Sequence, residues 1–88
     1  MQQGNRRKVT YLNKIMLFAQ LKEDMGKSLM KVEVSGKTVG ELRVFLEEET
    51  PLGSLDGIMI AVNEEFVKDD WVIGEKDEIA LIPPVSGG

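Results

Sequence analysis

The chain has 88 residues, of which 42% are hydrophobic, with 15 acidic and 11 basic residues and neither cysteine nor histidine. This length suits one small globular domain, and the net charge of −4 argues against a general affinity for nucleic-acid backbones or anionic membranes, so a basic partner surface is expected instead. The composition excludes disulfides, thiolate nucleophiles, cysteine metal sites and histidine bases. A chain without cysteine is compatible with the reducing cytoplasm, which is the expected location.

Residues 1–13 are interpreted as a polar N-terminal extension, either disordered or derived from a tag, ahead of the folded domain. Arg6, Arg7 and Lys8 followed by the apolar run 15–19 loosely imitate a signal peptide. That run is shorter than a signal core of about 7 to 15 residues and far shorter than the roughly 18 residues that span a membrane. We therefore expect neither a cleaved signal nor a membrane anchor.

Two strands are predicted ahead of the main helix. Residues 15–21 (IMLFAQL) are short and almost wholly apolar, which is typical of a central strand buried on both faces. After the polar stretch 22–28, Met30, Val32 and Val34 alternate with polar residues, the period-two pattern of a half-buried strand. The two strands are expected to form a hairpin.

One main helix is predicted to begin at Thr38 and to end before Pro51. Thr38 and Glu41 have the spacing of a capping box, in which each side chain accepts a hydrogen bond from the other residue's backbone N–H. Proline cannot continue the helical hydrogen bonding, so Pro51 terminates the helix. The apolar positions that share one face of this helix are Val39, Leu42, Phe45 and Leu46.

The remainder of the domain is predicted to consist of strands and turns. The predicted elements are a turn at 52–56, a strand at 58–62, a very short strand at 66–67, a turn at 74–77 and a last strand at 78–82. This order favours an α+β fold in which one main helix crosses one face of a mixed sheet of four to five strands. With the first and last strands parallel and adjacent at the centre, this is the ubiquitin-like β-grasp arrangement, expected to span residues 14–82.

Side-chain alternation predicts an apolar patch on the sheet face away from the helix. If Ile15, Leu17, Ala19 and Leu21 face the helix, Met16 and Phe18 face the other way. Ala80 and Ile82 of the last strand lie on that side too, and Ile82 completes the apolar patch. The patch is either a protein interface or the result of strand assignments shifted by one residue, or it is covered by the N-terminal segment.

The C-terminal segment PPVSGG carries the strongest functional signal. Pro83 and Pro84 cannot donate hydrogen bonds to a strand, so the chain leaves the sheet in an extended conformation. At about 3.1 Å per residue, six residues reach on the order of 20 Å from the body. Ser86, Gly87 and Gly88 decrease in bulk, so the end could enter a narrow channel with its carboxylate unshielded. The alternative is a frayed polar terminus.

The sequence resembles the MoaD family, the small sulfur-carrier subunits of molybdopterin synthase. The resemblance rests on LFAQLKE near the start, the capped helix, AVNEEFV and the terminal PPVSGG, and it extends from about Lys14 to Gly88. Ubiquitin-like carriers in general share only the two glycines, and the related thiamin carrier ThiS usually lacks the proline pair. Two departures are residues 1–13, which the family normally lacks, and Ile82, where an aromatic residue is common.

The resemblance implies that Gly88 is the reactive residue. In the family, a MoeB-like adenylyltransferase, related to ubiquitin-activating enzymes, uses ATP and magnesium to convert the terminal carboxylate to an acyl-adenylate, and a sulfur-donating enzyme leads to the thiocarboxylate. The tail then enters a MoaE-like large subunit, where the sulfur attacks the cyclic pyranopterin precursor. This chain is thus expected to bind no cofactor or metal and to bring no catalytic side chain to a heteromeric sulfurtransferase. Its partner-binding residues are expected to be Phe18, Ile82, Pro83, Pro84, Val85, Ser86 and Gly87.

Three alternatives stay open. A sulfur carrier for thiamin synthesis or tRNA thiolation would use the same tail with another partner. A ubiquitin-like modifier would be found in isopeptide linkage to lysines, and a pure interaction module would tolerate loss of Gly87 and Gly88. The acidic runs at 47–49, 64–65 and 69–70 are expected to be solvated surface because adjacent residues do not converge on one ligand. Trp71 either anchors an interface or lies partly buried in a loop.

Overall fold

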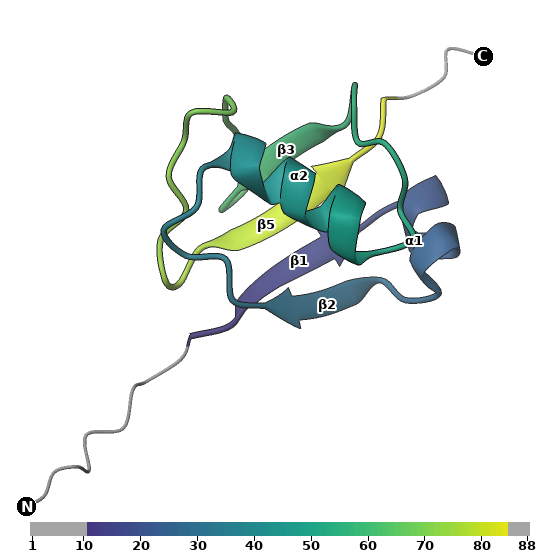
Figure 1. The fold of residues 1–88 in the computed structure, drawn as a ribbon, viewed down its shortest axis with the longest axis horizontal. Helices are drawn as coiled ribbons and strands as arrows, with labels where there is room; N and C mark the ends of the chain where they lie inside the picture. The colour runs from purple at the N-terminus through teal and green to yellow at the C-terminus, as the bar shows by residue number, and fades with distance from the viewer. Residues whose placement is uncertain (1–10, 85–88) are drawn as a thin grey trace, which may run out of the picture.

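The computed structural model describes residues 11–84 of the chain. Its strands are β1 (Asn13–Leu17), β2 (Leu29–Val32), β3 (Met59–Val62), β4 (Glu65–Phe66) and β5 (Glu78–Ile82), and its helices are α1 (Gln20–Met25) and α2 (Val39–Glu49). The strands form one sheet in the order β2-β1-β5-β3-β4, and α2 lies across one face of it (Figure 1). This architecture confirms the predicted α+β, β-grasp fold.

The central strands β1 and β5 run parallel, and every other pairing in the sheet is antiparallel in the described chain. Ile15 lies opposite Ile79 and Leu17 opposite Leu81, and all four are almost fully buried under α2. Parallel strands need a long crossover connection, which the β2–α2–β3 segment supplies. The predicted hairpin of the first two strands is also confirmed, with β2 ending at Val32.

Helix α2 begins at the predicted capping box. Thr38 Oγ1 accepts a hydrogen bond from the Glu41 backbone N–H at 3.1 Å, and Glu41 Oε1 accepts one from the Thr38 N–H at 2.8 Å. The helix ends at Glu49, two residues before Pro51. The predicted inner face is correct: Val39, Leu42 and Leu46 are fully buried and Phe45 is half-buried.

The predicted first strand is wrong beyond Leu17. The chain turns at Ala19, which has φ 53° and ψ −129°, and α1 follows where a strand end and a polar loop were expected. Ala19 is exposed rather than facing the core, whereas Leu21 is buried as predicted, but from a helix. Leu21 and Met25 are four residues apart and both contact the core, which is helical spacing. Gly26 then ends α1 with a left-handed backbone, a common helix terminus.

Asn13 belongs to β1, although the N-terminal extension was expected to include it. Its side chain is 1% exposed, and its Nδ2 donates hydrogen bonds to the carbonyl oxygens of Gly74 and Asp77, each at 2.9 Å. Its Oδ1 accepts a bond from the Val34 N–H at 3.3 Å. A buried amide with several partners fixes the start of β1 against two other segments. Residues 1–10 of the expected extension lie outside the described residues.

We predict that Asn13→Ala lowers the free energy of unfolding by about 2 to 3 kcal/mol, because it leaves buried backbone groups without partners. Urea titration followed by circular dichroism measures this change. Leu12→Ala is the matched control, since Leu12 is 54% exposed and its truncation should cost less than about 0.5 kcal/mol. Equal stabilities for the two variants would contradict the role assigned to Asn13.

Candidate functional site

The last strand leads directly into the proline pair. Ile82 is the final residue of β5, Pro83 is half-buried and Pro84 is exposed. Because β1 and β5 are parallel, the chain leaves the sheet at the same end at which β1 turns into α1 (Figure 1). The remaining tail residues predicted to act, Val85, Ser86, Gly87 and Gly88, lie outside the described residues.

An apolar row crosses the sheet face opposite α2, which we call the open face. The register places one residue from each strand in this row, in the order Leu29, Met16, Ala80, Ala61, Phe66. Leu29 is 40% exposed and Phe66 64%, whereas the two alanines are buried between larger neighbours. Because large apolar side chains surround the two small alanines, the surface is concave at the alanines. A concave apolar surface can accept a protruding side chain of another protein.

A second apolar row lies beside the tail on the same face. Met59 pairs with Ile82 across β3 and β5, and Phe18 follows the end of β1. Met59 is 43% exposed and Phe18 45% exposed. Phe18, Met16, Ile82 and Phe66 line a shallow groove of about 360 Å³ whose floor contains the two alanines. The predicted patch is therefore present, and its role as an interface stays a prediction.

The sequence analysis missed four members of this surface: Leu29, Met59, Ala61 and Phe66. Alternation within one strand assigns its two faces, but the assembly of a patch depends on the register between strands. The patch around Met16 combines β1 with β5, which is 60 or more residues away along the chain. Only the pairing brings these strands together.

The turn at Ala19 keeps Phe18 at the surface. A positive φ combined with ψ −129° is a conformation that residues with a side chain rarely adopt. Lys22 and Leu21 N–H groups donate to the carbonyl oxygens of Ala19 and Phe18 at 3.0 and 3.1 Å, which starts α1 immediately. Burial of Leu21 then anchors α1 on the core. The strained corner thus separates a buried leucine from an exposed phenylalanine three residues earlier.

Polar residues border the open face at the end away from the tail. Asn63 Nδ2 donates to Asp77 Oδ1 at 2.9 Å, and the Glu78 N–H donates to Asn63 Oδ1 at 2.9 Å. The hydrogen bond from the Gly74 N–H holds the pKa of Asp77 below its ordinary value against the effect of partial burial, and bonds from Asn63 and Trp71 lower it further. Asp77 therefore stays ionised near neutral pH and fixes this turn, so it does not fit the role of a general acid.

Trp71 lies half-exposed in the loop before β5, with 44% of its surface accessible. Its backbone carbonyl accepts a hydrogen bond from the Val39 N–H at 2.9 Å, which attaches the loop to the start of α2. This backbone bond gives Trp71 a structural position in the loop, and a role of its exposed side chain as an interface anchor stays a prediction.

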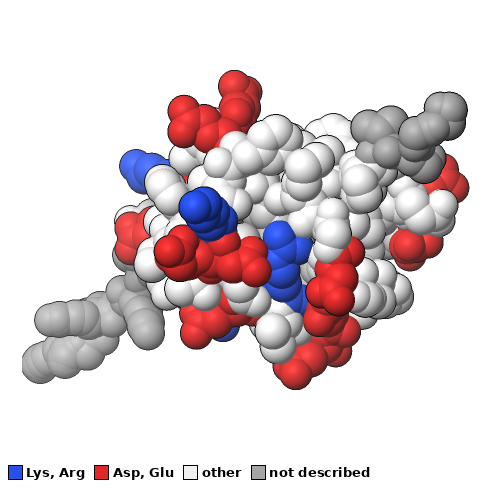
Figure 2. Space-filling model, turned by 90° about the horizontal axis from the view of Figure 1, so that it is seen from above, with Lys and Arg blue, Asp and Glu red and all other residues white. Residues whose placement is uncertain are grey.

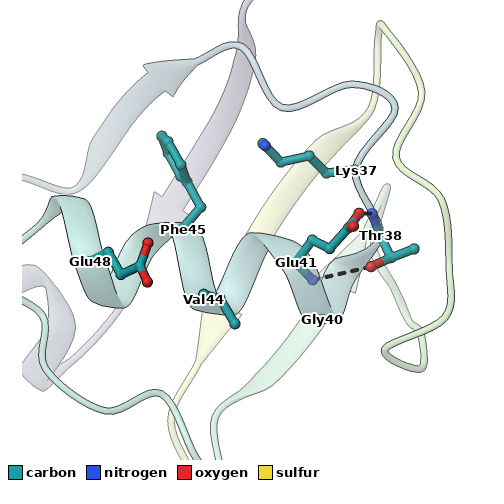
Figure 3. A pocket seen from close by; sticks show the side chains of 7 residues that line it. All are labelled: Lys37, Thr38, Gly40, Glu41, Val44, Phe45 and Glu48. Atoms are coloured by element: carbon teal, nitrogen blue, oxygen red, sulfur yellow. Dashed lines mark hydrogen bonds between the residues drawn. The ribbon is translucent and has the colours of Figure 1, made fainter.

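The outer side of α2 carries a separate groove, which Figure 3 shows. It has a volume of about 500 Å³, and Val44, Phe45 and Glu48 contribute to its lining. Lys37 Nζ lies 5.4 Å from the centre of the Phe45 ring, a cation–π distance. The Glu41 carboxylate points back to Thr38 and is occupied in the capping box. The lining offers no convergent set of catalytic groups.

Charge on the described surface is unevenly distributed. Figure 2 shows acidic side chains in several groups around an uncharged area that extends toward the end of the molecule where β5 finishes. Within residues 11–84, no group of three or more acidic residues could hold a metal ion, and no helix is long and apolar enough to cross a membrane. Among the described residues, we take the open face beside Ile82 and Pro83 as the candidate site because exposed apolar side chains gather there.

Comparison with known proteins finds a matching family and several similar sulfur carrier subunits. The ThiS family matches residues 15–88. The molybdopterin synthase sulfur carrier subunit of Dictyostelium discoideum is 35% identical over 83 residues, which cover 85% of this chain and 94% of that protein. The match therefore includes the domain and the C-terminal segment, and it spans nearly the whole length of the relative.

Two solved structures share the fold. SAMP1 from Haloferax volcanii, a small archaeal modifier protein, is 32% identical with a TM-score of 0.72, covering 88% of this chain and 99% of that one. A complex of subunits 1 and 2 of the molybdopterin-converting factor from Helicobacter pylori contains a chain that is 25% identical, with a TM-score of 0.65 and coverages of 88% and 99%.

We predict that Ala19→Gly raises the free energy of unfolding by about 1 kcal/mol, because relief of the strained backbone exceeds the entropy that glycine adds to the unfolded chain. Thermal and urea unfolding measure the change. Ala61→Gly is the control with the opposite sign, since Ala61 sits in a strand with ordinary backbone geometry and should lose about 0.5 to 1 kcal/mol. A destabilised Ala19→Gly variant would refute the strain.

Proposed function

The chain belongs to the ThiS family, and we propose that it is the sulfur carrier subunit of a molybdopterin synthase. The observation that carries the proposal is the junction at Ile82. There a central strand passes beside an exposed apolar face directly into Pro83 and Pro84, and the sequence ends in VSGG. The relative from Dictyostelium discoideum, which is named for this function, supports the choice among the pathways that ThiS-like proteins could serve.

The chemistry follows from the terminal carboxylate of Gly88. A carboxyl group with a reference pKa of about 3.5 is ionised and unreactive at neutral pH, so it must be activated. In the proposed sequence, an adenylyltransferase partner binds ATP and magnesium, and the carboxylate attacks the nucleotide to form an acyl-adenylate with release of pyrophosphate. Hydrosulfide supplied by a donor enzyme then attacks the acyl carbon and displaces AMP, which leaves a thiocarboxylate on Gly88 without a change of oxidation state.

The open face and the tail would have different roles in sulfur transfer. Phe18, Ile82 and the neighbouring apolar residues bind the large subunit, while Pro83 to Gly88 enter its active site. There the thiocarboxylate sulfur would form a C–S bond to the cyclic pyranopterin precursor and displace an oxygen substituent. Water would then cleave the acyl–sulfur bond, which leaves the sulfur on the product and returns the Gly88 carboxylate. The solved complex of two molybdopterin-converting factor subunits supports a two-subunit arrangement. In the proposed mechanism, groups of the large subunit hold the pterin and move protons. A cytoplasmic location accords with the need for ATP.

We predict that removal of Gly87 and Gly88 abolishes molybdopterin synthesis but leaves the fold and the binding of the large subunit nearly unchanged. The reason is that the apolar contacts come from the domain, whereas the reacting atom is on Gly88. Product formation is measured in a reconstituted reaction with the large subunit, the activating enzyme and the precursor, and binding is measured by calorimetry. Synthesis at the rate of the full chain would refute the proposed role of the tail.

We predict that Phe18→Ala weakens binding of the large subunit by about ten- to a hundredfold, as truncation of an aromatic interface anchor does. Because Phe18 is 45% exposed in the free protein, the melting temperature should change little. Val44→Ala, at a 53% exposed position on the other side of the molecule, is the matched control and should bind like the wild type. Equal affinities for both variants would exclude Phe18 from the interface.

A second candidate function is supported by the similarity to a small archaeal modifier protein. A modifier would use the same activated Gly88 but would transfer the whole chain to a lysine amine. Expression of a tagged form in the native host distinguishes the two functions. A ladder of heavier conjugates that disappears when Gly88 is removed favours the modifier, whereas a single unconjugated species favours the carrier.

A further inference from the structure

We infer that a charge axis across the open face fixes the orientation in which the large subunit docks. Lysines on the β1–β2 side would face carboxylates of the partner, and glutamates on the β5–β3 side would face its cations. This inference rests on the proposed function, because it assigns the chemistry of the partner surface that the carrier must meet.

The basic side of the axis is formed by three lysines. The register places Lys14 directly opposite Lys31, on the same face as Met16 and Leu29. Lys22 of α1 and Lys14 line a second groove of about 530 Å³, together with Met16 and Leu29. All three lysines are exposed. Cations therefore stand at both ends of an apolar groove on this side of the face.

The acidic side begins at the next strand. Glu78 on β5 is the other lateral neighbour of Lys14, and Glu64 follows in the turn between β3 and β4. Both glutamates line the first groove, beside Phe66. Met16, Phe18 and Glu78 line both grooves, so the two grooves form one continuous surface. Its charge changes sign between β1 and β5.

In the free domain, the two lysines Lys14 and Lys31 repel each other, and Lys14 and Glu78 do not form an ion pair. Like charges directly opposite each other in an antiparallel pair destabilise a sheet, which applies to Lys14 and Lys31. In the part of the chain that the structure describes, Arg43 and Asp69 form the only ion pair, so Lys14 and Glu78 are neighbours without a salt bridge. A partner carboxylate placed near Lys14 and Lys31 would remove their repulsion.

Orientation matters because apolar contact alone is not directional. A partner held only by Phe18, Ile82 and the rows beside them could bind in more than one rotation about the axis normal to the sheet. The tail leaves the face at a single end, so only one rotation brings it into the partner's active site. Complementary charges stabilise the one rotation in which opposite charges meet, and repulsion between like charges destabilises the other rotations.

The test exchanges the charges at the centre of the axis. Lys14→Glu combined with Glu78→Lys reverses the central pair of the axis, keeps the net charge at −4 and preserves an opposite pair between β1 and β5. It also places an acidic residue opposite Lys31, so the melting temperature should not fall. Calorimetry with the large subunit at low salt should give at least a tenfold weaker affinity, and the difference should shrink as salt is raised.

The control exchanges charges on the outer side of α2. Lys37→Glu combined with Glu48→Lys also keeps the net charge, and both residues line the groove in Figure 3. This variant should bind the large subunit like the wild type. Lys31→Glu is a second test variant, which should bind more weakly although its melting temperature rises.

Each outcome decides between the inference and the proposed function. If the wild type binds the large subunit and the Lys14–Glu78 exchange binds equally well, the charge axis is refuted and the carrier function stands. If the control exchange weakens binding as much as the test exchange, the axis is refuted as well. If the wild type neither binds the large subunit nor acquires sulfur, the proposed function fails and the inference falls with it.

Discussion

The parallel pairing of β1 with β5 is the constraint on which the rest of the structure depends. It joins strands from the two ends of the domain, and the connection between them must cross the sheet, which places α2 on one face. One helix covers one face, so the opposite face keeps its apolar rows accessible. The same pairing makes both strands finish at one end. Phe18, which follows β1, and Pro83, which follows β5, therefore lie at the same end of the sheet.

A carrier of this kind contributes position rather than catalysis. The domain presents the open face, and the chain leaves the sheet after Ile82 through Pro83 and Pro84. In the proposed mechanism, the reacting carboxylate is that of Gly88. Among the described residues, Asp77 is the one acidic side chain with a clearly lowered pKa, and hydrogen bonds from Gly74 and Asn63 hold it in a structural turn. Under the proposal, the same tail would enter an activating enzyme and then the synthase large subunit, and each partner would bring its own catalytic groups.

Much of the fold was predictable because several local signals agreed. The capping box at Thr38 and Glu41 located α2, and the proline at position 83 ended β5 at the observed residue. The error at residues 18–25 has a clear cause: a short apolar run does not distinguish a strand from a buried helical turn. Ala19 has a positive φ, but the sequence gives no sign of it because a glycine, the residue that usually marks such a backbone, is absent at that position. The burial of Asn13 and the set of residues on the open face depend on pairing between strands that are far apart in the sequence. A local sequence pattern does not show which strands pair.

The central claim is that Gly88 carries the sulfur, and intact mass spectrometry tests it most directly. The full chain is incubated with ATP, the adenylyltransferase and a sulfur source, treated with iodoacetamide, and digested to locate any label. Since the sequence has no cysteine, the account predicts one rapid alkylation confined to the C-terminal peptide. An unchanged mass, obtained with an enzyme preparation that activates a known carrier, would contradict the thiocarboxylate mechanism and leave the domain as a binding module.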